Sequence, residues 1–127
     1  MAKKRILVVD DEPDILELLD EVLSGQGYEV DSAASAARAL ELIRQKIYDA
    51  AILDFNLPDM DGVMLHREIR QMDEELGGNT LFTSGLMQSE KNLDYYTAFG
   101  KGFLSKPFEV REVLSALNGL WDEDSDA

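Results

Sequence analysis

Three acidic residues stand directly after short apolar runs, where their carboxylates could bind a metal ion. Asp10 and Asp11 follow the run ILVV at residues 6–9, and Asp54 closes the run AAILD at residues 50–54. A carboxylate at the edge of a core loses hydration and needs a compensating charge. Two unit charges about 4 Å apart repel by roughly 4 kcal/mol at an effective dielectric near 20. A divalent cation removes this repulsion, and Mg²⁺ suits a site with few carboxylates.

Three further polar groups occupy comparable positions. Thr83 follows Leu81-Phe82, Lys106 follows the run FLS, and Asn56 stands two residues beyond Asp54. A lysine adds positive charge, a threonine adds a hydroxyl donor, and Asn56 could add a backbone carbonyl. Together with carboxylates and a cation, these groups suit an acyl phosphate carried by a carboxylate. Phosphoryl transfer mainly requires positioning and charge neutralisation, which this set supplies.

The segments that would position these residues alternate between short apolar runs and amphipathic helices. We predict strands at residues 6–9, 28–33, 50–54, 79–85 and 102–105, and helices beginning near 13, 35, 61, 89 and 107. This alternation predicts one α/β domain with a parallel sheet and helices on both faces. The functional crevice of such a sheet lies at the carboxyl ends of the strands. If the first and third strands are neighbours, the three carboxylates converge there.

Charge and composition exclude several classes of function. Twenty-six acidic against twelve basic residues give a net charge of −14, which repels nucleic acid and anionic lipid. We therefore expect a bound cation or a basic protein partner, with no direct nucleic-acid or membrane binding. The chain has no cysteine, which excludes disulfides and thiolate catalysis. The apolar run at 6–9 is too short for a signal peptide, so we expect a cytoplasmic protein.

The motifs ILVVDDE, LDFNLPDMDG, a threonine after a strand, and KPF occur in this order. In order and spacing they resemble the receiver domain of bacterial two-component response regulators, from Lys4 to about Leu120. The resemblance implies a flavodoxin-like, doubly wound, five-stranded parallel sheet in the order 2-1-3-4-5, with five helices in three layers. We accordingly expect a receiver domain over residues 1–121 and an acidic, frayed end at 122–127.

The resemblance also implies roles for the polar residues. Asp54 is the phosphoacceptor, which takes a phosphoryl group from a histidine kinase's phosphohistidine. Mg²⁺, with Mn²⁺ as a substitute, is bound by Asp54, Asp11 and the Asn56 carbonyl, and by Asp10 through water. Lys106 pairs with the phosphate.

Three further roles follow from the same resemblance. The bond from Lys106 to Pro107 is cis, and Thr83 and Phe103 are the switch residues. They change the surface formed by the fourth helix, fifth strand and fifth helix. The implied partners are a sensor histidine kinase or phosphotransfer protein and a downstream protein, with the chain a monomer or a weak dimer through that surface. Such a domain catalyses its own phosphorylation and slow dephosphorylation and is not a conventional turnover enzyme.

Two features depart from the family pattern. Ser84 stands where alanine commonly follows the threonine, and the segment AFGKGF at 98–103 lacks the usual Gly-Ala pair. The output surface is therefore less well specified than the chemistry.

Three alternative functions share some of these features. A phosphohydrolase resembling the haloacid dehalogenases needs a second aspartate two residues after the nucleophile, where Asn56 stands here. A flavodoxin-like cofactor binder needs a phosphate-binding loop where this chain has the acidic segment DDEPD. A degenerate receiver could act as a phosphorylation-independent binding module. We predict no chemical role for three further polar residues. Asp59 and Asp61 are interpreted as turn and helix-capping residues, and His66 as a solvated side chain.

Overall fold

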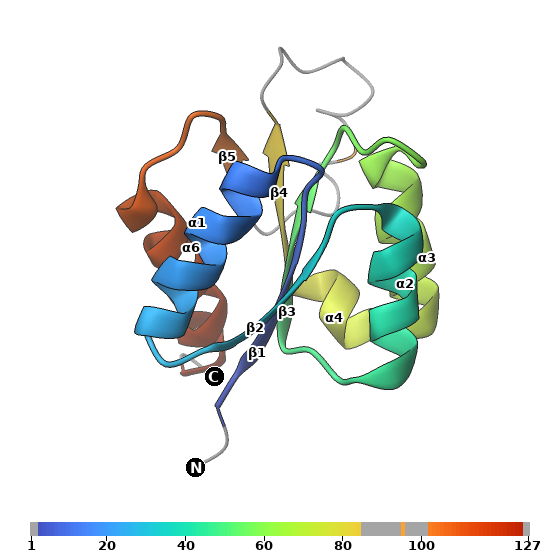
Figure 1. Ribbon diagram of the computed structural model, residues 1–127. Coiled ribbons are helices and arrows are strands. Elements are labelled where there is room, and N and C mark those ends of the chain that lie inside the picture. The colour runs from blue at the N-terminus through green and yellow to red at the C-terminus, as the bar shows by residue number, and fades with distance from the viewer. Residues whose placement is uncertain (1–2, 85–94, 96–101, 126–127) are drawn as a thin grey trace.

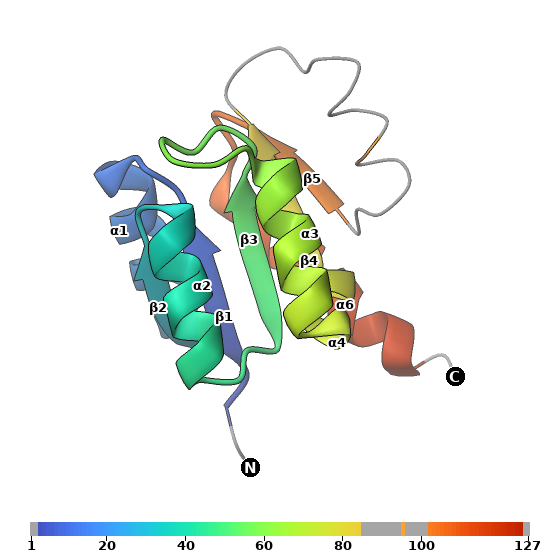
Figure 2. The same cartoon turned by 90° about the vertical axis from the view of Figure 1, so that its right-hand side faces the viewer.

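The computed structural model describes residues 3–84, 95 and 102–125, and for 122–125 it describes the backbone alone. Within these residues, five parallel strands form one sheet in the order β2-β1-β3-β4-β5 (Figures 1 and 2). The predicted fold class and strand order are confirmed. The strands are β1 Arg5–Val9, β2 Glu29–Ala33, β3 Ala50–Asp54, β4 Thr80–Ser84 and β5 Gly102–Ser105.

Helices cover both faces of the sheet. Figure 1 shows α1 and α6 on one face and α2, α3 and α4 on the other. Alternate residues of β1 serve the two cores: Leu7 and Val9 pack on the α2–α3 side, and Ile6 and Val8 on the α1–α6 side. The helices are α1 Pro13–Gly25, α2 Ala36–Gln45, α3 Gly62–Met72, α4 Glu74–Gly78 and α6 Val110–Ser125.

Helix ends follow the capping residues in the sequence. The Ser35 hydroxyl accepts a hydrogen bond from the Arg38 amide at the start of α2, and Asp61 accepts one from the Val63 amide at the start of α3. The sequence also predicts Ser35 as the N-cap of the second helix, and the caps predicted at Ser35 and Asp61 are both present. Helix α6 continues past residue 121 into the acidic segment.

Two predicted helices differ from the structure. The apolar spacing after Asp61 and the Gly77-Gly78 pair predict one continuous helix. In the structure it is interrupted at Asp73, whose backbone is extended and whose side chain caps α4 through the Leu76 amide. The helical spacing of the sequence predicts Ile47 on the apolar face of the second helix, but Ile47 lies beyond α2 and is 80% exposed. The helix predicted at 89–99 and most of the AFGKGF segment lie outside the described residues.

The prediction that His66 is solvated was wrong. Its side chain is fully buried, with Nε2 2.8 Å from the Gly77 carbonyl and Nδ1 2.6 Å from the Tyr95 hydroxyl. Because a carbonyl only accepts, Nε2 carries the proton and Nδ1 accepts from Tyr95. Burial lowers the pKa of His66, with a smaller lowering by the Arg70 charge and an opposing effect of the Gly77 carbonyl. His66 is therefore a neutral core residue.

An aromatic pair lies at the amino ends of the strands. Trp121 Nε1 donates to the Tyr28 hydroxyl at 2.9 Å, and Lys4 Nζ lies 4.3 Å from the centroid of the indole ring. Lys4 precedes β1 and Tyr28 precedes β2, so this contact joins α6 to the amino ends of the strands. Within the described part of the chain, none of the helices has the length and apolar character needed to cross a bilayer.

Candidate functional site

The carboxyl ends of four strands bring the predicted polar residues together. Asp54 is the last residue of β3, and its register partner in β4 is Thr83. Asp10 follows β1, the neighbour of β3 on the other side, and Lys106 follows β5. Asp10, Asp54 and Thr83 are each at most 3% exposed. Parallel pairing thus gathers side chains from distant parts of the sequence at one edge.

The centre of the site is the ammonium group of Lys106. Its Nζ lies 2.7 Å from Asp10 Oδ2, 2.9 Å from Asp54 Oδ2 and 2.9 Å from Glu12 Oε1. The peptide bond from Lys106 to Pro107 is cis. Glu12, at the start of α1, was not predicted as a site residue. Its position could have been predicted from the sequence, because Glu12 directly follows Asp10-Asp11 where the chain enters the helix.

Burial and these ion pairs act on the site in opposite directions. Burial by itself lowers the pKa of Lys106, but the hydrogen bonds to Asp10, Asp54 and Glu12 outweigh it and raise that pKa above its ordinary value. Burial raises the pKa of Asp10, partly offset by Lys106 and the Glu12 amide, and the nearby Asp54 charge raises it further. The lysine is therefore firmly cationic, and its neighbouring carboxylates are held at an electrostatic cost.

The acidic residues fit a divalent cation. Asp10, Asp11, Glu12 and Asp54 each offer a carboxylate oxygen, and these oxygens lie within 4.8 Å of one another. A single ammonium group leaves this cluster strongly negative, although Asp10 and Asp54 are buried. Hard oxygen donors with excess negative charge suit Mg²⁺. Asn56 lies beside the cluster, since its amide donates to Asp54 Oδ1 at 3.0 Å.

The turn after β3 requires a glycine at its end. The Gly62 amide donates to the Phe55 carbonyl at 2.9 Å, which brings the start of α3 against the end of β3. A Cβ atom at Gly62 would lie 2.6 Å from the Phe55 Cα and 2.7 Å from the Asp54 carbonyl oxygen. Both contacts are with backbone, which cannot rotate away. The absence of a side chain at Gly62 therefore sets the path of the chain leaving Asp54.

Asp59, predicted as a turn residue, makes a long-range contact. Its Oδ1 accepts from the Ala36 amide at 2.9 Å and its Oδ2 from the Ala37 amide at 3.0 Å. These two backbone N–H groups lower the pKa of the Asp59 carboxyl. The carboxylate thus fastens the segment after Asp54 to the start of α2.

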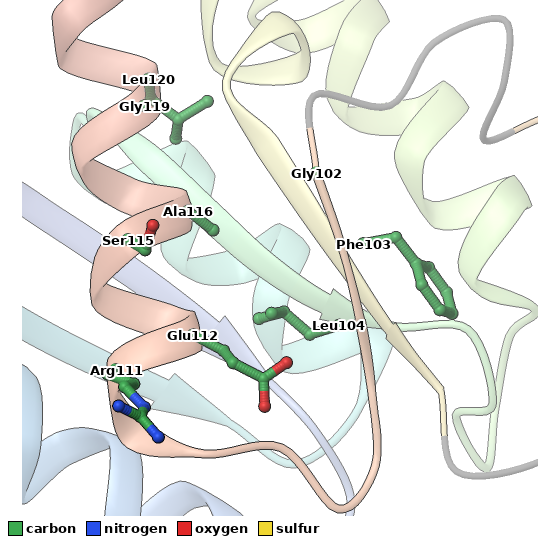
Figure 3. Close-up of a pocket in the computed structure, with 9 residues that line it drawn as sticks. All are labelled: Gly102, Phe103, Leu104, Arg111, Glu112, Ser115, Ala116, Gly119 and Leu120. Carbon is green, nitrogen blue, oxygen red and sulfur yellow. The ribbon is translucent and has the colours of Figure 1, made fainter.

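Phe103, the predicted switch aromatic, packs on the α2–α3 side of the sheet. Its ring lies 6.2 Å from that of Phe55, the residue after Asp54. Figure 3 shows the Phe103 ring directed away from α6, on the other side of β5 from Leu104. A groove of about 710 Å³ lies between β5 and α6, with Leu104, Ala116 and Leu120 in its lining. The Phe103 ring thus lies near Phe55, on the face of the sheet opposite α6.

Comparison with known proteins identifies the family that has this fold and these residues at the strand ends. A model of the response regulator receiver domain matches residues 6–118, and the chain belongs to this family. The resemblance inferred from the motifs is confirmed. The chain is a receiver domain of two-component signalling, which is a signalling module and not a conventional enzyme.

Two relatives from Bacillus subtilis (strain 168) align along nearly their whole length. Sporulation initiation phosphotransferase F is 31% identical over 120 residues, which cover 92% of this chain and 93% of that protein. Chemotaxis protein CheY is 32% identical over 115 residues, which cover 90% and 94% respectively. Among solved structures, a CheY-like response regulator receiver domain protein from Methanospirillum hungatei JF-1 has a TM-score of 0.89 at 28% identity. That match covers 99% of this chain and 100% of that one.

Proposed function

We propose that Asp54 accepts a phosphoryl group from the phosphohistidine of a histidine kinase or a phosphotransfer protein. The observation that carries this proposal is the contact of Lys106 with both Asp54 and Asp10 at the strand ends. Oδ2 of Asp54 faces the ammonium group, and Oδ1 accepts from the Asn56 amide. A carboxylate held at both oxygens is oriented before the donor arrives, which lowers the entropic part of the barrier.

In the transfer, an oxygen of Asp54 forms a bond to phosphorus while the phosphorus–nitrogen bond of the donor breaks. The electron pair of that bond returns to the imidazole. Lys106 then pairs with an oxygen of the transferred group, and Thr83 offers its hydroxyl from the neighbouring strand. The two residues come from β5 and β4, so formation of the acyl phosphate draws both strand ends toward β3.

Metal binding belongs to the same proposal. Asp11, Asp54 and the Asn56 carbonyl would hold Mg²⁺, or Mn²⁺ as its substitute, with Asp10 acting through water. When bound, such an ion would supply positive charge to the transferred phosphoryl oxygens. Four carboxylates with oxygens within 4.8 Å of one another, three of them in contact with Lys106, support this assignment.

Phosphorylation is communicated to the protein surface by a conformational change that involves β5. Thr83 and Phe103 change position when Asp54 is phosphorylated, and the output surface predicted for the fourth helix, fifth strand and fifth helix changes with them. Phe55 supports this route because it follows Asp54 and stacks near Phe103. A downstream protein, or a second copy in a weak dimer, reads that surface. The proposal places this exchange in the cytoplasm.

Two alternative functions predict different behaviour. A haloacid-dehalogenase-like hydrolase needs a proton shuttle at Asn56, and an amide cannot take that role, so we expect no turnover of aryl phosphates. A degenerate receiver would bind its partner without being phosphorylated. The presence of Asp54, Lys106 and the acidic cluster at one edge favours the phosphoacceptor.

Intact mass spectrometry with acetyl phosphate and Mg²⁺ tests the proposal. The wild type should gain the mass of one phosphoryl group, and Asp54→Asn should gain none. Asp49→Asn is the matched control, because Asp49 precedes β3 and binds the Arg5 amide at the opposite edge of the sheet. It should behave as the wild type. No gain in the wild type, or an equal gain in Asp54→Asn, would defeat the assignment.

A further inference from the structure

Asp59 completes the start of a helix that lies far from it in the sequence. The first amides of an α-helix have no partner inside the helix. In α2, those of Ala36 and Ala37 donate to the two oxygens of Asp59, and that of Arg38 donates to the Ser35 hydroxyl. The helix start is therefore satisfied by two side chains, one adjacent and one from the segment between β3 and α3.

The same segment carries the backbone of the proposed metal ligand. Asn56 and Asp61 pair as an isolated antiparallel bridge, and the Phe55 carbonyl accepts from the Gly62 amide. These contacts close the base of the turn. Asp59 lies on the outer part of the turn, and its two hydrogen bonds attach that part to α2.

The attachment point is rigid. Ala36 and Ala39 of α2 are fully buried, so the start of this helix is packed against the core. An acceptor with both oxygens on adjacent amides has a defined orientation, and the positive end of the helix favours its negative charge. The turn thus gains a fixed support outside its own hydrogen bonds.

We infer that Asp59 is a positioning residue for the metal site, because it ties the turn to α2 and so holds the Asn56 carbonyl where a cation can bind. The inference rests on the proposed function, which makes that carbonyl a ligand. It adds a residue that touches neither the cation nor the phosphoryl group.

The test compares Asp59→Ala with Ser35→Ala. Each variant removes one capping side chain from the start of α2, but only Asp59→Ala releases the turn. The first measurement is amide hydrogen exchange at Asn56 and Gly62 without metal, and the second is the Mg²⁺ dissociation constant by calorimetry. Asp59→Asn is the third variant, since it keeps an acceptor oxygen and guards against a general failure to fold.

Asp59→Ala should exchange faster at both amides and bind Mg²⁺ about tenfold more weakly, at the low end of the loss seen when residues that orient metal ligands are changed. Ser35→Ala should match the wild type in both measurements, and Asp59→Asn should recover part of the affinity. If Asp59→Ala and Ser35→Ala change amide exchange and Mg²⁺ affinity equally, Asp59 acts only as a helix cap and the inference is overturned.

A wild type that binds no Mg²⁺ would instead overturn the proposed function and the metal part of this inference. The exchange measurement would still decide whether Asp59 holds the turn.

Discussion

The ammonium nitrogen of Lys106 lies 2.9 Å from Oδ2 of Asp54, a residue 52 positions earlier in the chain. The same nitrogen lies 2.7 Å from Asp10 Oδ2. One lysine thus pairs with two buried carboxylates at the ends of different strands. These contacts need no bound cation, so the effect of Lys106 on stability can be measured separately from the proposed phosphoryl transfer.

Replacement of Lys106 should destabilise the protein in a way that Mg²⁺ partly reverses. Lys106→Met leaves Asp10 and Asp54 buried without a cation, so we expect a loss of about 3 kcal/mol in the free energy of unfolding. A divalent ion can take over the lost charge. Urea unfolding followed by circular dichroism, with and without Mg²⁺, measures both effects. The control is Lys46→Met, whose 3.1 Å pair with Asp31 is solvent-exposed and worth less than about 1 kcal/mol. Equal losses in the two variants would contradict this prediction.

Asp11 should contribute to metal binding with little effect on metal-free stability. It is exposed, so Asp11→Asn should change the free energy of unfolding by about 0.5 kcal/mol or less without Mg²⁺. Wild type should gain about 2.7 kcal/mol when Mg²⁺ is 100-fold above its dissociation constant, and the variant should gain less at that concentration. Thermal or urea unfolding against Mg²⁺ concentration provides the measurement. Asp14→Asn, in the first turn of α1, should retain the wild-type gain.

Gly62→Ala should disrupt the turn, because its Cβ would lie 2.6 Å from the Phe55 Cα. We expect a loss of about 1–3 kcal/mol in the free energy of unfolding, together with slower phosphorylation by acetyl phosphate. Gly78→Ala is the control, since a Cβ there meets nothing within 4 Å and the residue belongs to α4. Alanine at position 78 should be neutral or stabilising by up to roughly 1 kcal/mol. A Gly62→Ala protein as stable and reactive as the wild type would show that the turn can move.

His66 should make stability depend on pH. Its folded pKa is lowered below 6.5, so the folded state binds fewer protons than the unfolded state in the interval between these values. The contribution is fully present above pH 6.5 and is lost as pH falls through the folded pKa. Urea unfolding between about pH 5 and pH 7.5 should show this decline in wild type and a flatter profile in His66→Gln. Parallel profiles would assign the decline to other groups.

The strand ends of this fold are readable from sequence because parallel pairing gives every strand the same polarity. Apolar runs identified β1 and β3. Because the strands are parallel, the polar residues that follow these runs lie together at the carboxyl ends of the strands. Asp10, Asp54, Thr83 and Lys106 were located in this way. The neighbour relation of β1 and β3 came from the family resemblance, since residue patterns leave strand order open.

The misses have physical causes. His66 stands beside Arg67 and Glu68, which suggested solvent, but it lies three residues from both Val63 and Ile69 on the buried face of α3. This helical spacing from two apolar residues was the feature of the sequence that indicated burial of His66. The contacts of Asp59 with α2 and of Glu12 with Lys106 depend on how separate segments fold against each other, and no local pattern encodes them. The break at Asp73 was visible only as a capping residue before Glu74.

The hydrogen bond between Trp121 and Tyr28 has a practical consequence for experiments. Trp121 is the only tryptophan in the chain, and its indole lies at the amino ends of the strands, away from Asp54. We expect its fluorescence to report unfolding of the domain and to stay nearly constant when a cation or a phosphoryl group binds. An optical assay of this chain therefore needs a second fluorophore, introduced near the carboxyl ends of the strands.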